Sequence, residues 1–472
     1  MVLGQVFVFL TALAVVGLMS VDIIVFPECG LTGCNYWDRN YVIEEVAEII
    51  PSPDSGVVPC KKKSYTQRNS MYVAVNLYEK FIELDNQNDT NLHNKSNDIL
   101  LYNTNIVFDR FGRLIARYRK FNLYAERTHL GVNSTKEPEF SIFTTDFGVT
   151  FGIIICFDII FKQPVYGLLY EKNVSALIFS GAIYSQLPFL VVPSLVSGWS
   201  YSMNTTVLFS DMPVKKGSVG GSGIFMGKSD PLRLIMEEHY DSKILISKVP
   251  KPVSSANLPS LEEKTHENEK SNFCDSMFIA DEKLDYYTYQ SISQNLTHKC
   301  NNLLMNSFNH TNENYTCTIR AVWQINSITN QSEYKFLSYA GERNFSTASI
   351  NNYVEVCGLT LCHKSPNGGC LEPPIFEDAF SITMIHIDIF SVSTVDAIVI
   401  PSTLNSSLHP LSVKNFRFSK SKTRIGNHEN IIVHMNLIEP VSNLITFGFY
   451  KLPEVSNPDP ASYHSRNTTE LN

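Results

Sequence analysis

Short apolar runs alternate with more polar segments along the first half of the chain. Runs rich in β-branched and aromatic residues predict strands, and segments with helical spacing of apolar residues lie between them. The runs are VDIIVF, MYVAVNL, NIVFD, RLIARY, FGIIIC, SALIFS, TTVLFS and KILISKV. Between NIVFD and RLIARY lies RFG, a compact turn in which Gly112 is free to take a positive φ. This alternation is typical of an α/β domain, which we place at residues 21–250.

The pattern changes after residues 251–272, which are rich in proline, serine and charged residues and therefore predict a linker. Beyond the linker the chain shows strand-like runs, clustered glycosylation sequons and six of the ten cysteines. Residues 273–472 are therefore predicted to form a separate β-rich domain that is held partly by disulfides.

The first 20 residues form an apolar run that ends in a small residue, which is typical of a signal peptide, although no Lys or Arg precedes the run. The alternative is an amphipathic or buried N-terminal helix. N-x-S/T sequons favour the secretory pathway because so many occur together. They lie at Asn88, Asn94, Asn133, Asn173, Asn204, Asn295, Asn309, Asn314, Asn330, Asn344, Asn405 and Asn467. We expect a secreted, extracellular glycoprotein.

The amino-acid composition and net charge indicate which kind of molecule the protein binds. The 472 residues are 44% hydrophobic, enough for a large core, and the net charge of -8 provides no basic field for nucleic acid. A small molecule is the more plausible partner. No later segment reaches 18 apolar residues and the C-terminal residues are polar, so we expect neither a membrane span nor a GPI signal.

Cysteine usage predicts disulfides rather than a metal site. In an oxidising compartment most of the ten cysteines should pair, and if Cys156 stays free, at least one more is unpaired or bonded to another molecule. The segment CGLTLCHKSPNGGC brings three cysteines near His363, but zinc sites favour tighter spacing. We therefore expect disulfides within residues 274–370 and no metal.

One cysteine stands at a position that is typical of a catalytic nucleophile. Cys156 ends the apolar run FGIIIC, and the next residues have helical spacing with Pro164 in a first turn. A cysteine where a strand passes into a helix has the geometry of a nucleophile elbow. The alternative is a buried structural cysteine, since free cysteine usually behaves as a small hydrophobe.

Two polar residues close other predicted strands, Glu28 after VDIIVF and Lys120 after RLIARY. Sites in α/β folds gather at the carboxyl ends of strands, so Glu28, Lys120 and Cys156 can converge. Glu28 would serve as the base that removes the thiol proton, and Lys120 with the backbone N–H of Phe157 would stabilise an oxyanion. Alternatively, Lys120 belongs to a solvated basic edge and Glu28 is a loop carboxylate.

The segments IIVFPE, LIARYRKFNLYAE, FGIIICFDIIF and the GSGIF turn, in this order, resemble the nitrilase, or carbon–nitrogen hydrolase, superfamily. The biotinidase and vanin (pantetheinase) branch is the most similar, and YVEVCGLTLC resembles the C-terminal domain of that branch.

The resemblance implies a four-layer α-β-β-α sandwich and an amidase with a Glu–Lys–Cys triad. Glu28 matches the general base of the family, Lys120 its lysine, Cys156 its nucleophile and Glu126 a supporting carboxylate. The reaction would pass through an acyl thioester without any cofactor. Members of this branch hydrolyse pantetheine or biotin amides, and the sequence does not decide which linear amide is the substrate.

The chain departs from the family pattern at two places. The signal-like run adjoins Val21 directly, so the first strand and helix of the sandwich are expected to be absent, and KKKSYTQRNS replaces a helix between Cys60 and Met71. Both gaps predict exposed apolar side chains on the sheet. They motivate an alternative function, a catalytically silent secreted glycoprotein of the same fold that acts by binding.

Overall fold

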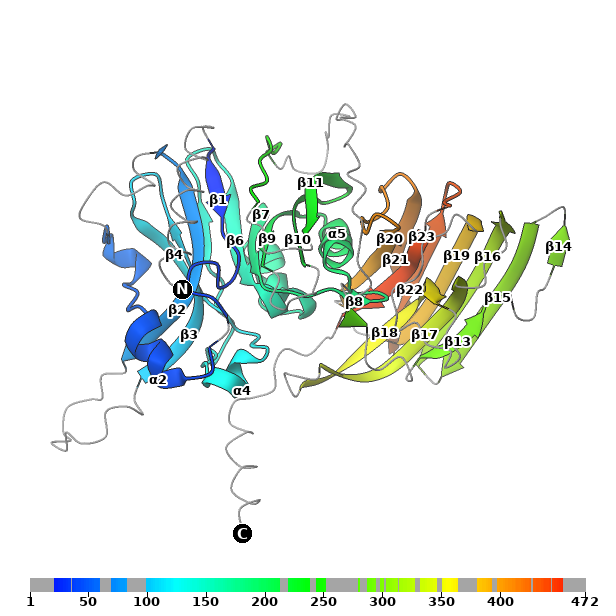
Figure 1. Ribbon diagram of the computed structural model, residues 1–472, viewed down its shortest axis with the longest axis horizontal. Coiled ribbons are helices and arrows are strands. Elements are labelled where there is room, and N and C mark those ends of the chain that lie inside the picture. Colours follow the sequence, from blue (N-terminus) through cyan, green and yellow to red (C-terminus); the bar gives the residue numbers. More distant parts are fainter. Residues whose placement is uncertain are drawn as a thin grey trace, which may run out of the picture.

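Two units lie side by side along the long axis of the molecule, an α/β unit built from the first half of the chain and a β-rich unit built from the second (Figure 1). The structure is a computed structural model. It describes residues 21–34, 36–59, 69–82, 99–212, 220–237, 243–251, 279–280, 287–293, 298–300, 303–312, 314–326, 332–345, 350–363, 380–392, 397–425, 428–442 and 444–452. The predicted signal segment and residues 252–272 of the predicted linker lie outside these residues.

The first sheet of the α/β unit has the strand order β1-β2-β3-β4. Its strands are β1 Ile23–Val25, β2 Tyr72–Ile82, β3 Ile99–Phe108 and β4 Leu114–Arg119. β1 runs parallel to β2, and the other neighbours are antiparallel. The predicted turn between β3 and β4 is confirmed, because Gly112 has a φ of 76°.

The second sheet has the order β11-β10-β9-β7-β6-β5. Its strands are β5 Ile142–Thr144, β6 Thr150–Ile155, β7 Ala176–Gly181, β9 Thr206–Asp211, β10 Gly220–Met226 and β11 Ser229–Glu237. β6, β7 and β9 are parallel to one another. Their carboxyl ends therefore lie at the same edge of the sheet.

The two sheets pack face to face, with helices outside. The inner faces share a buried core that includes Tyr72, Val107, Tyr118, Phe151, Ile153 and Ile178. Outside the first sheet lie α2 Arg39–Tyr41, η1 Val42–Val46 and η2 Pro53–Ser55, and outside the second lie η4 Gly167–Glu171 and α5 Val192–Met203. The α-β-β-α sandwich expected from the sequence is confirmed.

Three local predictions are wrong. Residues 243–249, KILISKV, form no strand, because they lie beyond the edge strand β11 and pair with no strand of the described residues. The segment after Cys156 is no single helix but η3 Cys156–Ile160 and then η4, because Pro164 disfavours helical backbone at Gln163. GSGIF lies inside β10 and is no turn.

The outer face of the first sheet, predicted to be exposed by the two gaps, is buried in the described residues. Met71, Val73, Val75, Ile106 and Leu114 are each at most 4% exposed. Partly buried apolar side chains that pack against this group include Leu31, Ile50, Leu77 and Phe108. The expectation of bare apolar side chains on this face is therefore wrong, because the segments around residues 31 and 50 cover it. Residues 1–20 and 60–68 lie outside the described residues.

The second unit is a β-sandwich of two sheets with the orders β13-β17-β18-β23-β20 and β14-β15-β16-β19-β22-β21. The first comprises β13 Thr288–Ser291, β17 Ser332–Phe345, β18 Ile350–His363, β20 Val399–Asn405 and β23 Leu444–Lys451. The second comprises β14 His298–Cys300, β15 Leu303–Asn312, β16 Tyr315–Ile325, β19 Phe380–Val392, β21 Phe416–Ile425 and β22 His428–Leu437. The disulfide Cys317–Cys357 joins the two sheets and confirms that a disulfide lies within residues 274–370.

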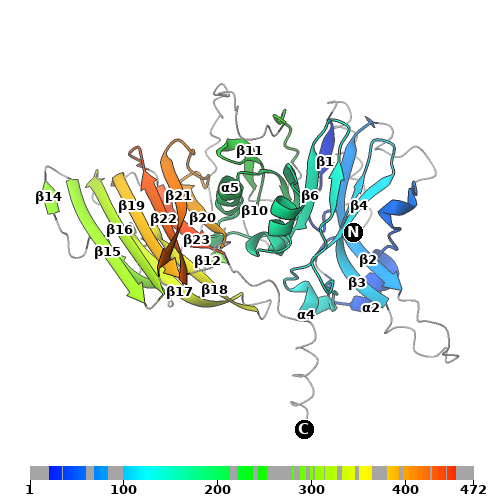
Figure 2. The same ribbon diagram turned by 180° about the vertical axis from the view of Figure 1, so that it is seen from behind.

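The two units pack closely against each other, with α5 and β20 side by side in both views (Figures 1 and 2). The Ser202 hydroxyl donates to the carbonyl of Val399 at 2.7 Å, and Arg343 Nη2 donates to Gln186 Oε1 at 3.1 Å. Gln186 belongs to the two-residue strand β8, Gln186–Leu187, which pairs with β12, Ile279–Ala280. The second unit therefore contacts the loop that follows β7.

Among the described residues, no helix combines the length and the apolar character needed to cross a membrane.

Candidate active site

The three predicted site residues each follow a strand, and they lie close together between the two sheets. Glu28 follows β1, Lys120 follows β4 directly, and Cys156 follows β6 directly. All three side chains are buried, with exposed fractions of 4%, 1% and 8%. A buried thiol beside a buried acid and a buried cation is a combination found at functional sites, so this group is the candidate site.

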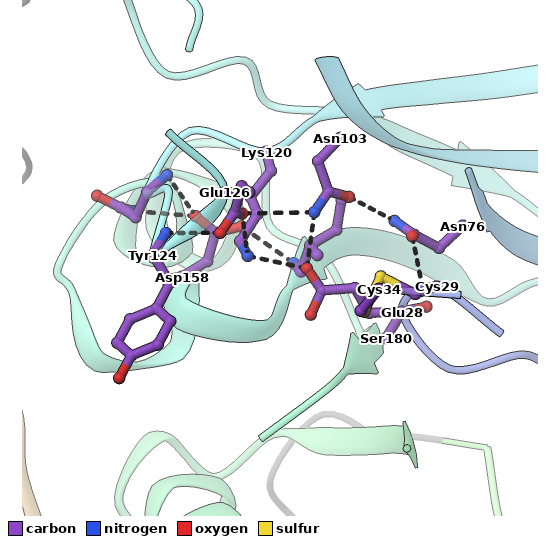
Figure 3. A network of polar contacts seen from close by, with 12 residues as sticks. Glu28, Cys29, Cys34, Asn76, Asn103, Lys120, Tyr124, Glu126, Asp158 and Ser180 are labelled. Carbon is purple, nitrogen blue, oxygen red and sulfur yellow. Dashed lines mark hydrogen bonds and ion pairs between the residues drawn. A yellow bond between two sulfur atoms is a disulfide. The ribbon is translucent and has the colours of Figure 1, made fainter. Parts of the chain in front are cut away.

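Lys120 lies between two carboxylates (Figure 3). Its Nζ donates to Glu28 Oε1 at 2.9 Å and to Glu126 Oε1 at 2.6 Å. Glu126 begins the short helix α4, Glu126–Leu130, and its second oxygen accepts the backbone N–H of Tyr124 at 3.0 Å. An ammonium group has three N–H donors, so one remains beyond those given to the two carboxylates.

The charge of Lys120 is fixed by these neighbours. Burial acts to lower the pKa of Lys120, but the carboxylates of Glu126 and Glu28 outweigh it and hold this pKa well above its ordinary value. Lys120 therefore stays protonated at neutral pH. It supplies a permanent positive charge and cannot act as a base.

Cys156 is a protonated thiol in the resting protein. Burial raises the pKa of Cys156 well above its ordinary value, and the Glu28 carboxylate raises it further. The charge of Lys120 and a hydrogen bond from the backbone N–H of Ala182 lower it only in part. A thiol in this setting needs a nearby base to become a nucleophile, and Glu28 is the carboxylate placed beside it.

The backbone at Cys156 has the strained form expected of an elbow. β6 ends at Ile155, η3 begins at Cys156, and the φ of Cys156 is 45°, in the left-handed region that side chains other than glycine avoid. Phe157, the predicted second oxyanion donor, follows in the first turn, and its ring contacts Tyr124 edge to face with centroids 5.0 Å apart.

Asp158 connects the elbow to the segment around Lys120 by hydrogen bonds. Asp158 Oδ2 accepts the backbone N–H of Ile155 and the hydroxyl of Tyr118, while Oδ1 accepts the backbone N–H and the side-chain amide of Asn122. Burial raises the pKa of Asp158 to about 6. Sequence reasoning assigned Asp158 no role, although an aspartate inside an apolar run is a signal that it has buried partners.

Sequence reasoning also missed Asn103, which lies in the middle of β3. Asn103 Nδ2 donates to Glu28 Oε1 at 2.7 Å, and the carbonyl of Asn103 accepts the backbone N–H of Lys120 at 2.8 Å. One residue thus touches both the predicted base and the predicted lysine. An asparagine within the apolar run LLYNTNIVF was the available signal.

A further missed residue, Asp211, ties the loop after β7 to β10. Its Oδ1 accepts the backbone N–H of Ile183 at 2.9 Å, and its Oδ2 accepts that of Gly221 at 3.0 Å. A Cβ at Gly220 would lie 2.4 Å from Asp211 Oδ2, so only glycine fits there. Burial and the charge of Glu28 raise the pKa of Asp211 to about 7, although hydrogen bonds from the backbone of Ile183, Gly221 and Met212 oppose this shift.

The raised pKa of Asp211 predicts a pH-dependent contribution to stability. An unfolded aspartate has a pKa of 3.8, whereas this one is about 7 when folded. Between pH 4 and 7 the folded protein keeps a proton that the unfolded chain has lost, so this carboxyl weakens the fold as pH rises through that window. The Tm of the wild type minus the Tm of Asp211→Asn should therefore fall from pH 4 to pH 7 and then level off. A difference that is constant with pH would contradict the shift.

The loop after β7 contacts aromatic side chains beside Cys156. The hydroxyl of Tyr184 is hydrogen-bonded to that of Tyr124, and Tyr124 packs against Phe157 as described above. The described residues contain no group of His, Cys, Asp and Glu side chains that could hold a metal ion. The groups assembled at this place, a thiol, carboxylates and an ammonium, are those of acyl transfer through a covalent intermediate.

Comparison with known proteins identifies the family. The carbon–nitrogen hydrolase family matches residues 10–215, and the vanin C-terminal domain matches residues 276–455. Vanin-like protein 2 of Drosophila melanogaster is 30% identical, covering 91% of this chain and 83% of its own length. Pantetheinase of Bos taurus is 33% identical over 47% of this chain and 43% of its own length, and biotinidase of Takifugu rubripes is 25% identical over 74% of this chain and 71% of its own length.

Among solved structures, an amidase from Nesterenkonia sp. aligns over 50% of this chain and 83% of its own, with a TM-score of 0.37 and 13% identity. The matches to the family and to the vanin C-terminal domain cover the two units of the fold in turn. The chain therefore belongs to the vanin and biotinidase branch of the nitrilase superfamily and is a carbon–nitrogen hydrolase that acts on amides.

Proposed function

We propose that this protein is a secreted amidase that hydrolyses a linear carboxamide through an acyl thioester on Cys156. Glu28 accepts the thiol proton as Cys156 Sγ attacks the amide carbonyl carbon. Lys120 and the backbone N–H of Phe157 stabilise the oxyanion that forms. Glu28 then donates the proton to the leaving amine, the C–N bond breaks, and water attacks the thioester with Glu28 as base to release the acid and restore the thiol.

The observation that carries this proposal is the burial of an acid, a cation and a thiol together, with Lys120 Nζ 2.9 Å from Glu28 Oε1. The roles follow from the charges. Because the pKa of Cys156 is raised, the thiol requires a base, and because the pKa of Lys120 is raised, that base is not the lysine. Glu28 is left as the proton acceptor and Glu126 as the second carboxylate that holds Lys120 in place.

For the substrate we propose pantetheine-like or biotin-amide-like compounds, in keeping with the relatives named pantetheinase and biotinidase. The experiment is to incubate the purified protein with pantetheine and with a biotin amide, to measure amine release, and to detect the acyl adduct on Cys156 by mass spectrometry. Release of amine with an adduct supports the proposal. Neither amine nor adduct with any linear amide tested favours the catalytically silent glycoprotein.

Glu28→Gln tests whether Glu28 acts as the general base. Glutamine keeps the shape of the side chain but accepts no proton, so acylation should stop while the fold persists. Alkylation of Cys156 by iodoacetamide should slow in the same variant, because no carboxylate then accepts the thiol proton as the sulfur attacks. Wild-type rates in both assays would remove Glu28 from the mechanism.

Secretion is supported by two kinds of feature. The disulfides Cys29–Cys34 and Cys317–Cys357 are typical of an oxidising compartment. Sequon asparagines with exposed side chains are Asn173, Asn204, Asn309 and Asn314. Protein collected from the medium of eukaryotic cells should shift to lower mass on removal of N-glycans, and an unshifted band would contradict glycosylation.

A further inference from the structure

A disulfide lies directly beside the proposed general base. Cys29 follows Glu28 in the chain and is bonded to Cys34, five residues on. Cys29 is 3% exposed and has a φ of 57°, a left-handed conformation that costs free energy in a residue other than glycine. Its carbonyl accepts the backbone N–H of Gly33 at 2.7 Å, so the short loop is closed by both a covalent and a hydrogen bond.

Two asparagines connect this loop back to the carboxylate of Glu28 (Figure 3). The backbone N–H of Cys29 donates to Asn76 Oδ1 at 2.8 Å. Asn76 Nδ2 donates to Asn103 Oδ1 at 2.7 Å, and Asn103 Nδ2 donates to Glu28 Oε1 at 2.7 Å. The chain of hydrogen bonds begins one residue after Glu28 and returns to its side chain, and Asn76 and Asn103 are both buried.

In this relay, which runs from the backbone N–H of Cys29 through Asn76 and Asn103 to Glu28, two backbone groups orient Asn76: the N–H of Cys29, and the carbonyl of Thr104, which accepts from Asn76 Nδ2 at 3.3 Å. A backbone N–H can only donate, so it requires the oxygen of the Asn76 amide to face it, which turns the Asn76 NH₂ group toward Asn103. Asn103 must then accept with its oxygen and present its NH₂ group to the carboxylate. If the N–H of Cys29 moved away, the oxygen of Asn76 would lose its donor, and the contact that turns the Asn103 NH₂ group toward the Glu28 carboxylate would weaken.

We propose that the Cys29–Cys34 disulfide is a positioning element for Glu28 that acts through Asn76 and Asn103. The disulfide holds Cys29 in its left-handed conformation, and that conformation aims the N–H at Asn76. The two amides then add a second contact to the one from Lys120, so that Glu28 Oε1 is held by Asn103 Nδ2 at 2.7 Å and by Lys120 Nζ at 2.9 Å. This inference rests on the proposed role of Glu28 as general base.

The test compares two disulfide-free variants, Cys29→Ser with Cys34→Ser and, as the matched control, Cys317→Ser with Cys357→Ser. Both remove one disulfide, but only the first lies beside Glu28. For the first pair we expect kcat to fall about tenfold or more with KM changed less than about threefold, because a displaced base lowers the rate of the chemical step. Alkylation of Cys156 by iodoacetamide should slow in parallel, and the control pair should lose Tm without this change in kcat.

Asn76→Leu breaks the relay with the disulfide intact and should reproduce the loss in kcat, which keeps the proposal testable if the serine pair does not fold. An unchanged kcat and alkylation rate in either folded variant would overturn the inference while leaving the amidase proposal standing. A wild-type protein without any amide hydrolysis would instead remove the amidase proposal, so the two failures are distinguishable.

Discussion

Replacement of Cys156 by serine is expected to abolish amide hydrolysis while the protein stays folded. The substitution changes one buried atom, and the left-handed backbone at this position tolerates serine as well as cysteine. A serine hydroxyl has a far higher pKa than a thiol, and a carboxylate such as Glu28 is too weak a base to remove its proton. We expect kcat/KM to fall at least about a thousandfold, on the order of 4 kcal/mol.

The measurement is the turnover of the best amide substrate, together with the Tm and the far-UV circular dichroism of each variant. Cys156→Ala serves beside Cys156→Ser, because alanine has no nucleophile at all and defines the background rate. The two variants should have the same residual rate and form no acyl adduct. Wild-type turnover in Cys156→Ser would remove Cys156 from the mechanism.

The hydrophobic pattern predicted the central strands because burial on both faces leaves a clear signal. FGIIIC and SALIFS are continuous apolar runs, and they form β6 and β7. The edge of the same sheet gave a weaker signal. β11, SDPLRLIME, mixes charge with apolar residues because it lies at the edge of the sheet, whereas KILISKV shows a strand pattern but has no partner strand.

The candidate site was predictable only where residues stand at strand ends in recognisable motifs. Glu28, Lys120 and Cys156 were singled out in this way, and the structure brings them together, while their catalytic roles stay a prediction. Asn76 and Asn103 stand within strands, and their importance depends on the register that places β2 beside β3. A register cannot be read from one strand alone, so the sequence showed two unusual polar residues without showing that they are bonded.

Replacement of Lys120 is expected to have the second large effect, on both the stability of the protein and its activity. Lys120 is the buried cation between the carboxylates of buried Glu28 and partly buried Glu126, so Lys120→Met should also destabilise the fold by about 3–5 kcal/mol. Lys451→Met is a matched control, because Lys451 is 3% exposed and bonded to buried Glu355 at 3.0 Å in the β-sandwich. The control should lose stability in a similar way and retain kcat.

Beyond stability, Lys120→Met and Lys120→Arg are both expected to lose at least about a hundredfold in kcat/KM, on the order of 2.7 kcal/mol. Attack by Cys156 creates an oxyanion, and a fixed ammonium stabilises that charge more than it stabilises the neutral amide. Arginine keeps the charge, but its planar fork does not fit where a compact ammonium contacts two carboxylates. Rapid-mixing measurements should place the loss in acylation, since the oxyanion first forms there. A folded Lys120→Met protein that acylates at the wild-type rate would refute the role, because the charge of Lys120 would then be needed only to hold Glu28 and Glu126 together.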